Sequence, residues 1–256
     1  MFDLHTHTSF SDGRNSPEEM VLSAIDRGLS VLGISDHSYT SFDESYCIPR
    51  ARLEAYKTCI HSLREKYRGR IGIVLGLEKD YYSDTVDDGY DYLIGSVHYL
   101  RLGGEYIPVD ESAEILIDAA VRHCGGDIYS LAEIYYNTVS DVIHRTKADI
   151  IGHFDLFKKF NRDGSLFDER APRYKKAVID ATDRLLAFDV PFEVNTGAIF
   201  RGYRDDPYPS PEIIGYIKAR GGKLILSSDS HASDSLCFAF GQFADSIQPQ
   251  NPKDFK

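Results

Sequence analysis

The sequence predicts an α/β fold in which a mostly parallel sheet closes into a barrel. Seven short apolar runs alternate with longer segments whose apolar residues follow helical spacing. Because a strand, a helix and the next parallel strand form a right-handed crossover, this alternation favours parallel pairing. The runs are continuously apolar, which is typical of a sheet covered on both faces. Seven such units favour a barrel over an open sheet.

The strands are expected at the apolar runs. They lie at 3–8, 30–37, 71–80, 90–100, 148–155, 191–197 and 223–231. None approaches the roughly 20 apolar residues that a membrane-spanning helix needs, so we expect no membrane partner. With 42% hydrophobic residues and neither a repeat nor a linker, the chain is predicted to form one domain over 1–256.

The helices are expected between these runs. The first opens at Ser16-Pro17-Glu18-Glu19, where a serine N-cap, a proline at the first helical position and a glutamate three residues after the cap form a capping box. Another begins at Ser210-Pro211-Glu212 and stops at Gly221-Gly222. The remaining helices are expected at 51–67, 111–124, 130–145 and 173–188.

Charge and cysteine content restrict the partners and the compartment. The 29 basic and 40 acidic residues give a net charge of -11, which repels the phosphate backbone of long nucleic acids. The four cysteines contain no CxxC pair, which argues against a disulfide framework and against a zinc ribbon. Because the N-terminus also has no basic-then-apolar leader, we expect a cytoplasmic protein with reduced thiols.

Ionisable residues end nearly every apolar run. These residues are His5, His7, Asp36, His37, Glu78, His98, His153, Glu193, Asp229 and His231. The carboxyl ends of the strands share one face of a parallel barrel, so six of the nine histidines are expected to converge there. His61, His123 and His144 lie in helical segments and are expected to be surface residues.

A metal cluster is the expected reason for this convergence. Burying many imidazoles and carboxylates is costly unless each has a partner, and divalent cations satisfy both. In His5-Thr6-His7 the two-residue period of a strand places both imidazoles on one side. Histidine with carboxylate and without thiolate suits Zn, Mn or Fe. The nine candidate ligands are His5, His7, Asp12, His37, Glu78, His98, His153, Asp229 and His231.

Nine ligands are too many for one tetrahedral ion and indicate a cluster of two or three ions. Such clusters serve phosphoester hydrolysis, because paired cations hold a hydroxide and neutralise charge during an in-line displacement. Phosphoester hydrolysis is therefore the leading prediction. A GxSxG nucleophile turn and a GxGxxG dinucleotide motif are both missing from the sequence.

Seven segments of the sequence resemble the PHP (polymerase and histidinol phosphatase) superfamily, and the resemblance extends over the whole length. They are DLHTHTSFSDG at 3–13, ISDH at 34–37, GLE at 76–78, GSVHY at 95–99, GHFDLFKKFNR at 152–162, EVNTGAIFRGYRDDPYPSP at 193–211 and SSDSH at 227–231. The later segments are similar to those of monofunctional histidinol-phosphate phosphatases. The resemblance implies a distorted (β/α)7 barrel with a metal centre at the C-terminal ends of the strands.

The resemblance also implies three groups of ligands. One ion would take His5, His7, Glu78 and Asp229; a second, bridged by Glu78, would take His98 and His153; a third would take Asp12, His37 and His231. The implied reaction is hydrolysis of L-histidinol phosphate to L-histidinol and phosphate in histidine biosynthesis, with a metal-bridging hydroxide as the nucleophile. The identity of the ions stays open between Zn, Mn and Fe.

Cationic side chains are expected to hold the phosphate. Arg162 and Arg201 each follow a strand-end segment, and a guanidinium fork matches phosphate geometry. Lys159 is a further candidate. Asp229 or His231 is the expected catalytic residue that relays a proton to the leaving alkoxide.

The substrate amine needs an acidic neighbour, for which Glu193, Asp43 and Glu44 are alternatives. The long segment 38–50 is either a partial lid over the substrate or an ordered surface loop. Two other functions stay open, namely a PHP phosphoesterase acting on nucleotides or oligonucleotides, and a noncatalytic metal-binding barrel.

Overall fold

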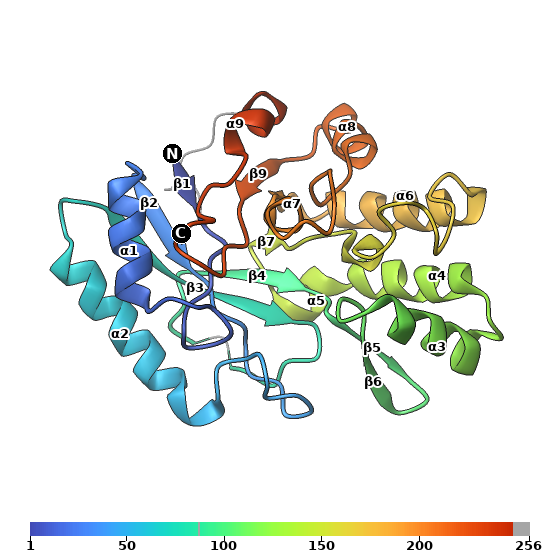
Figure 1. Ribbon diagram of the computed structural model, residues 1–256, viewed down its shortest axis with the longest axis horizontal. Coiled ribbons are helices and arrows are strands. Elements are labelled where there is room, and N and C mark those ends of the chain that lie inside the picture. Colours follow the sequence, from blue (N-terminus) through green and yellow to red (C-terminus); the bar gives the residue numbers. More distant parts are fainter. Residues whose placement is uncertain (87, 248–256) are drawn as a thin grey trace.

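Seven parallel strands form the central sheet of the computed structural model, which describes residues 1–86 and 88–247. Their order is β1 (Phe2–Asp3), β2 (Val31–Ile34), β3 (Gly72–Asp80), β4 (Tyr92–Ser96), β7 (Ile150–Ile151), β8 (Phe192–Asn195) and β9 (Leu224–Ser227) (Figure 1). Each neighbouring pair is parallel. A strand lies at each of the seven predicted runs, but most are shorter than predicted: β1 ends at Asp3, before His5 and His7, and β7 has only two residues.

The two edges of this sheet meet just beyond β1 and β9. Thr6 and Ser230 form a parallel bridge. The backbone N–H of His7 donates to the carbonyl of Ser230 at 2.8 Å, and that of Ser230 donates to the carbonyl of His5 at 3.2 Å. The predicted distorted barrel is confirmed as a nearly closed one, and the seam lies among the predicted metal ligands.

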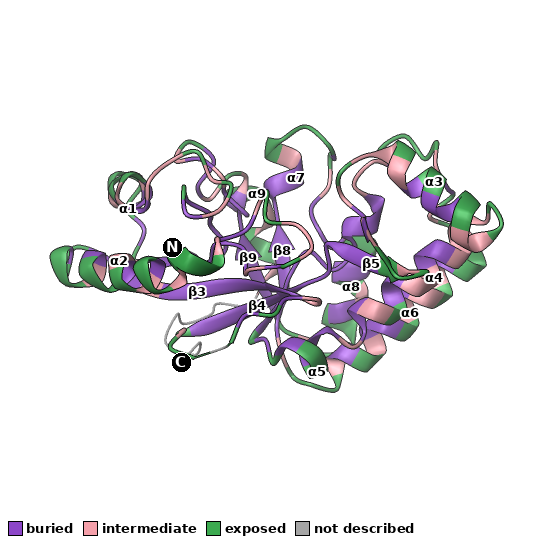
Figure 2. Cartoon of the chain, turned by 90° about the horizontal axis from the view of Figure 1, so that it is seen from below, coloured by how far each residue is buried: buried purple, intermediate pink, exposed green. Residues whose placement is uncertain are grey.

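Helices cover the outside of the sheet. The helices α1 (Pro17–Asp26) and α2 (Leu53–Lys66) lie beside β2 and β3 (Figure 1). Three further helices lie at the opposite end of the molecule in this view, namely α3 (Ala113–Cys124), α4 (Ile128–Val139) and α6 (Pro172–Leu186). The helix α8 (Pro211–Ala219) connects β8 to β9. Figure 2 shows β3 and β4 almost wholly buried, while the helices alternate buried and exposed residues. This is the arrangement expected of amphipathic helices packed on a covered sheet.

The predicted capping box of α1 is confirmed. The backbone N–H of Glu19 donates to Ser16 Oγ at 3.4 Å, and the carboxylate of Glu19 accepts from the backbone N–H of Ser16 at 2.7 Å. The prediction of one continuous helix at 130–145 is wrong, because α4 ends at Val139 and α5 (Val142–Thr146) follows. Ser140 Oγ donates to the carbonyl of Asn137 at 2.7 Å, and such local bonds compete with a continuing helix.

One side chain fills much of the barrel interior below the predicted site. Tyr92 is buried in a small cluster with Leu4, Ile94, Ile150 and Ile225, and its hydroxyl donates to the carbonyl of Leu4. A Cβ added to Gly33 or Gly76 would overlap the Tyr92 hydroxyl and ring. The strands β2 and β3 therefore need glycine where this ring crosses the barrel. The barrel interior below the predicted site is filled by packed side chains and is not an open channel.

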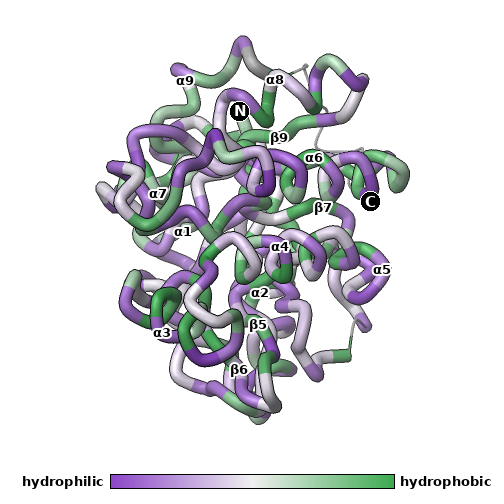
Figure 3. The backbone as a smooth tube through the Cα atoms, turned by 90° about the vertical axis from the view of Figure 1, so that its right-hand side faces the viewer, coloured by the Kyte–Doolittle hydropathy of each residue, from purple (hydrophilic) through white to green (hydrophobic). Residues whose placement is uncertain are grey.

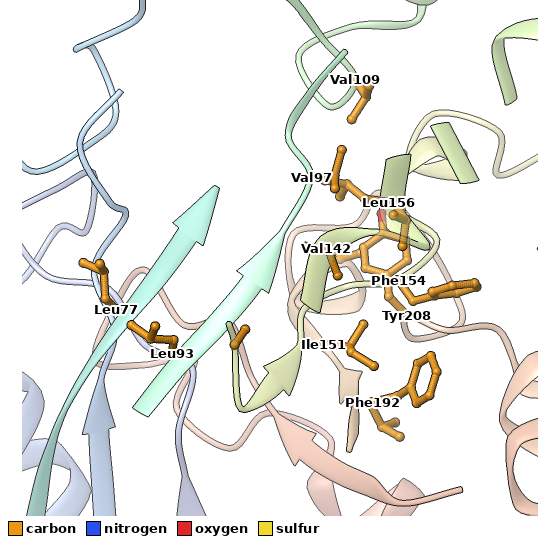
Figure 4. Close-up of a cluster of buried hydrophobic side chains, with 14 of the residues drawn as sticks. Leu77, Leu93, Val97, Val109, Val142, Ile151, Phe154, Leu156, Phe192 and Tyr208 are labelled. Carbon is orange, nitrogen blue, oxygen red and sulfur yellow. The ribbon is translucent and has the colours of Figure 1, made fainter. Parts of the chain in front are cut away.

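A larger apolar core lies between the sheet and the helices. Figure 4 shows Leu77 and Leu93 side by side on β3 and β4, where they are register partners. The rings of Phe154 and Phe192, both labelled in Figure 4, are 5.7 Å apart. In Figure 3 the backbone at β9 carries the hydrophobic colour.

In the described chain, no helix is both long and apolar enough to cross a membrane.

A β-hairpin follows β4 and was not predicted. It consists of β5 (Tyr99–Leu102) and β6 (Glu105–Pro108), which pair antiparallel. The expected strand at 90–100 breaks after Ser96, and the backbone N–H of His98 donates to Asp80 Oδ2 at 3.0 Å. Gly103 and Gly104 have φ values of 57° and 93°, which a two-residue hairpin loop requires.

Candidate metal centre

The strands bring all nine predicted ligands together at the carboxyl ends. Donor atoms fall into three groups, each with its atoms within 4.8 Å of one another: His7, Asp12, His37 and His231; His5, His7 and Asp229; His37, Glu78 and His98. The ninth residue, His153, joins them because its Nε2 lies 2.7 Å from Glu78 Oε1. His7 and His37 each belong to two groups, so the sets overlap more than the family resemblance implies.

Glu78 lies at the centre of the cluster and is 1% exposed. Its Oε1 lies 2.7 Å from Nε2 of His153 and 3.3 Å from Nε2 of His98. Its Oε2 lies 2.8 Å from Nδ1 of His37 and 3.3 Å from Nε2 of His5. Nε2 of His7 also lies 3.6 Å from Oε2. Because the two oxygens face different histidines, this carboxylate has the placement of a bridging ligand.

Asp229 and Asp12 complete the other two groups. Asp229 Oδ1 lies 3.1 Å from Nε2 of His7 and 3.6 Å from Nε2 of His5. Asp12 Oδ2 lies 3.1 Å from Nε2 of His231. The ring of His7 is stacked against that of His231 with the centroids 4.1 Å apart. The loop after β1 and the loop after β9 therefore form one wall of donor atoms.

Several of these buried atoms make no hydrogen bond within residues 1–86 and 88–247. They are His5 Nε2, both ring nitrogens of His7, Glu78 Oε2 and Nδ1 of His98 and His153. Unsatisfied buried polar atoms are costly and rare, so their concentration at one point needs an explanation. Divalent cations fit, because imidazole nitrogen and carboxylate oxygen are the donors that Zn, Mn and Fe accept.

The local electrostatics hold Glu78 and Asp229 ionised and His7 neutral. For His5, His37 and His98, burial lowers the pKa, but Glu78 and the other nearby carboxylates outweigh it and raise the pKa above its usual value. Burial raises the pKa of Glu78, but His37 and His5 outweigh it and hold that pKa well below its usual value. Burial also opposes the charge of Asp229, while Arg201 and His5 lower its pKa well below the usual range. Burial, together with His231 and His37, lowers the pKa of His7 to about 3. Anionic carboxylates and neutral His7 are the forms that bind metal.

Glu193 hydrogen-bonds to two of the candidate ligands, His5 and His153. Its Oε2 lies 2.8 Å from Nδ1 of His5 and accepts from Ser227 Oγ at 2.6 Å, while Oε1 accepts from Asn195 Nδ2 at 2.9 Å and from the backbone N–H of His153. Glu193 is fully buried and does not line the cavity described below. Its suggested role as the acceptor of the substrate amine is therefore wrong, because its carboxylate is enclosed by these four partners.

Asp36 fixes the loop that carries Asp12. Its carboxylate accepts from the backbone N–H and the hydroxyl of Thr8, both at 2.7 Å, and from the backbone N–H of Ser11 at 3.2 Å. Burial raises the pKa of Asp36 to about 6 against the effect of these hydrogen bonds. Asp36 thus organises the segment between β1 and α1, although it directly precedes His37 in the sequence.

A cavity of about 480 Å³ opens on the cluster. Six candidate ligands reach it, namely Asp12, His37, His98, His153, Asp229 and His231. Its other charged wall residues are Arg14, Asp43, Asp110, Glu111, Lys159 and Arg201, and its aromatic ones are Tyr46, Tyr99, Tyr203 and Tyr208. The segment 38–50 contributes Asp43, Ser45 and Tyr46, so it forms a wall of this cavity. His61, His123 and His144 do not line it, and His123 is mostly covered beside Glu105.

The three predicted phosphate-binding cations differ in placement. Arg201 lines the cavity, with its Nη2 2.8 Å from Asp229 Oδ2. Lys159 also lines it, with its Nζ 3.2 Å from Asp110 Oδ2. Arg162 is 54% exposed and is held by Asp205, with Nε 2.9 Å from Oδ2, and it does not line the cavity. The structure therefore brings Arg201 and Lys159 to the site and leaves Arg162 outside it.

Arg14 and Tyr208 also line the cavity and were not predicted there. Arg14 comes two residues after Asp12, so its position in the motif was the available signal. Tyr208 reaches the site because its backbone N–H and carbonyl pair with Asn195 at the end of β8, at 3.0 and 2.6 Å. Tyr208 lies within the segment quoted at 193–211, so its position in that motif was the available signal.

The chain is similar in sequence to known proteins. The PHP domain model matches residues 3–196. A probable histidinol-phosphatase of Deinococcus radiodurans is 30% identical over 257 residues, which covers 96% of this chain and 91% of the relative. The histidinol-phosphatase of Bacillus subtilis is 24% identical over 94% of this chain and 97% of the relative.

Two solved structures are similar in fold. A candidate histidinol phosphatase from Listeria monocytogenes superposes with a TM-score of 0.81 at 22% identity, covering 95% of this chain and all of that chain. The histidinol phosphate phosphatase of Lactococcus lactis, complexed with zinc, L-histidinol and phosphate, gives a TM-score of 0.72 at 20% identity, over 96% of this chain and 94% of that one. With the family match over three quarters of its length, the chain belongs to the PHP domain family.

Proposed function

We propose that this protein is a metal-dependent histidinol-phosphatase, which hydrolyses L-histidinol phosphate to L-histidinol and phosphate in histidine biosynthesis. The observation that carries the proposal is the placement of Glu78, whose two oxygens face different histidines: His98 and His153 on one side, and His5, His7 and His37 on the other. Relatives named histidinol-phosphatase match the chain over nearly their whole length. The Lactococcus lactis structure with the same fold holds zinc, L-histidinol and phosphate.

The nine clustered side chains would hold two or three divalent ions, with Zn, Mn and Fe as the fitting metals. Glu78 would bridge two of them, and Asp12 and Asp229 would each serve one group together with histidines. When bound, such ions supply positive charge for the phosphate and lower the pKa of a coordinated water. The packed ring of Tyr92 below the cluster closes the barrel interior, so the substrate reaches the site from the cavity.

The protein's own residues bind and orient the ester. Arg201 is fixed by Asp229 and lies 3.2 Å from His231 Nδ1, so its guanidinium can hold phosphate oxygens beside the cluster. Lys159 adds a second positive charge at the cavity wall. Asp229 and His231 both line the cavity, and either can relay the proton that the leaving alkoxide needs. Catalysis by this site rests on positioning and charge, so it needs no covalent nucleophile.

The cavity is suited to a small phosphorylated metabolite. A volume of about 480 Å³ lies in the range typical of small-molecule sites. The net charge of -11 disfavours long nucleic acids. All four cysteines are free, which fits the cytoplasm as the compartment.

Phosphate release is the direct test. The purified protein, reconstituted with Mn or Zn, is given L-histidinol phosphate, nucleoside monophosphates and a short oligonucleotide. We expect kcat/KM for L-histidinol phosphate to exceed that for the nucleotides by more than about tenfold, a difference of only about 1.4 kcal/mol in transition-state stabilisation. A smaller ratio would favour the nucleotide phosphoesterase, and no release with any ester would favour a noncatalytic metal-binding barrel.

A further inference from the structure

We infer that Asp43 binds the cationic end of the substrate, and so determines which phosphate esters the site accepts. The inference rests on the proposed function, because it assigns one wall of the same cavity. The ligand chemistry is a positively charged N–H group on the same molecule as the phosphate. L-Histidinol phosphate offers two such groups, the amine and the protonated imidazole.

The rings of Tyr46 and Tyr99 lie between Asp43 and the metal cluster. The ring of Tyr46 is 5.0 Å from that of His37, a candidate ligand, and 6.0 Å from the ring of Tyr99. The hydroxyl of Tyr99 donates to Asp43 Oδ2 at 2.6 Å. All four side chains line the cavity. A molecule with its phosphate at the cluster therefore extends along the tyrosines towards this carboxylate.

The carboxylate of Asp43 is held in one orientation by neutral donors. Its Oδ1 accepts from the backbone N–H of Ser45 at 2.9 Å and from Ser45 Oγ at 2.7 Å, while Oδ2 accepts from Tyr99. Burial raises the pKa of Asp43, but the hydrogen bonds from Ser45 and Tyr99 outweigh it, so the pKa lies below its usual value. These bonds fix the group without neutralising its charge.

Among the described acidic residues of the cavity, Asp43 is the one that is partly buried and has no charged partner. Asp12 and Asp229 belong to the metal cluster, and Asp110 is paired with Lys159 at 3.2 Å. Within residues 1–86 and 88–247, no lysine, arginine or histidine forms an ion pair with Asp43, and no cation contributes to its pKa. Glu111 is exposed, so its charge is solvated.

A cationic N–H group is the ligand that this arrangement fits. An ionised carboxylate on a cavity wall is stabilised most by a charge-assisted hydrogen bond. The faces of Tyr46 and Tyr99 add to the attraction, since aromatic rings bind cations through their quadrupole. An ester without a positive charge would leave Asp43 unpaired in the complex, and this penalty provides the discrimination.

The test compares Asp43→Asn with the unaltered protein on three esters. These are L-histidinol phosphate, the imidazolylpropyl phosphate that lacks the amine, and the 2-aminopropyl phosphate that lacks the imidazole. We expect Asp43→Asn to lower kcat/KM for L-histidinol phosphate by about 10- to 100-fold, mainly through KM, as for loss of a hydrogen bond to a charged group. The loss should shrink at least several-fold on the analogue that lacks the bound cation, which identifies that cation as the amine or the imidazole.

Glu44→Gln is the matched control. Glu44 is the next carboxylate in the chain, but it accepts from Tyr39 at 3.0 Å and does not line the cavity, so its kinetics should not change. Tyr99→Phe is a second variant, which removes one bond that orients Asp43 and should give a smaller loss with the same dependence on the ester. Thermal unfolding checks that each variant is folded.

An equal loss on all three esters, or no loss on any, would overturn the assignment of Asp43. A selective loss with Glu111→Gln in place of Asp43→Asn would also overturn it. These results differ from failure of the proposed function, in which the unaltered protein itself would not hydrolyse L-histidinol phosphate.

Discussion

Oε2 of Glu193 lies 2.8 Å from Nδ1 of His5, and both residues are completely buried. Nδ1 of this ring is thereby engaged, so His5 directs its Nε2 at Glu78 and Asp229. A carboxylate that accepts from a ligating imidazole fixes the tautomer and raises its basicity. Glu193 therefore positions a metal ligand without touching the cavity.

Replacing Glu193 with glutamine should weaken metal binding. The amide oxygen of glutamine can replace only one of the two carboxylate oxygens, so its NH2 group would face either His5 and Ser227 or the donors Asn195 Nδ2 and the backbone N–H of His153. We expect metal affinity to fall by about 10- to 100-fold. Metal titration followed by bound-metal analysis measures this change, with Glu212→Gln on the exposed start of α8 as the control. Unchanged affinity in Glu193→Gln would contradict the positioning role.

His98 and His144 provide a paired test of the cluster. Nε2 of His98 lies 3.3 Å from Glu78 Oε1, whereas the side chain of His144 is 74% exposed on α5. His98→Ala should reduce phosphate release by at least about 100-fold, because it removes a donor from a group expected to hold an ion that supplies several kcal/mol. His144→Ala should retain activity and metal content. Equal activity of the two variants would count against the cluster as the active site.

The ionisable residues at the ends of the apolar runs predicted the cluster, because parallel strands place their carboxyl ends on one face independently of the conformation of the loops. His5, Glu78 and His153 were found in this way. Arg162 shows the limit of this reasoning, since its loop turns the guanidinium to Asp205 instead of the cavity. Glu193 also ends a strand, but only the packing shows that its side chain lies behind His5. The hairpin at Gly103-Gly104 has a sequence signal, because a glycine pair between two short apolar runs is typical of a two-residue hairpin loop.

Arg201 should matter for activity and Arg162 should not. Arg201 is bonded to Asp229 at the cavity, while Arg162 forms an exposed pair with Asp205. We expect Arg201→Met to lower kcat/KM by about 100- to 1,000-fold, as for loss of one group that stabilises developing charge. Arg162→Met should stay within about twofold, because exposed ion pairs contribute little. Steady-state kinetics on L-histidinol phosphate distinguish these outcomes, and the reverse ranking would overturn the assignment of the phosphate site.

A buried lysine secures the segment that carries Arg201. Lys158 Nζ lies 3.0 Å from Asp206 Oδ2 and 3.3 Å from Asp155 Oδ2, and the Lys158 carbonyl accepts from Arg204 Nη1 at 3.0 Å. Lys158→Met should lower the free energy of unfolding by about 3–5 kcal/mol, because the fully buried carboxylate of Asp155 loses its charged partner. Lys176→Met, which removes an exposed pair with Asp180, should cost less than about 1 kcal/mol. Urea unfolding measures both, and similar values would contradict a structural role for Lys158.

Metal removal should destabilise the folded protein. Without cations, His5 Nε2, the His7 ring nitrogens and Glu78 Oε2 remain buried without hydrogen bonds in the described chain. Binding that favours only the folded state adds about 2.7 kcal/mol per site at a hundred times Kd. We therefore expect a chelator to lower Tm and added Zn or Mn to restore it, whereas Ca, which prefers all-oxygen sites, should not. Differential scanning calorimetry measures Tm. Because His98→Ala removes one donor from the cluster, its Tm should respond less to added metal than the Tm of the unaltered protein, whereas a general salt effect would be equal in both. A Tm that changes neither with chelation nor with added Zn would show that these buried atoms without hydrogen bonds do not form a metal site.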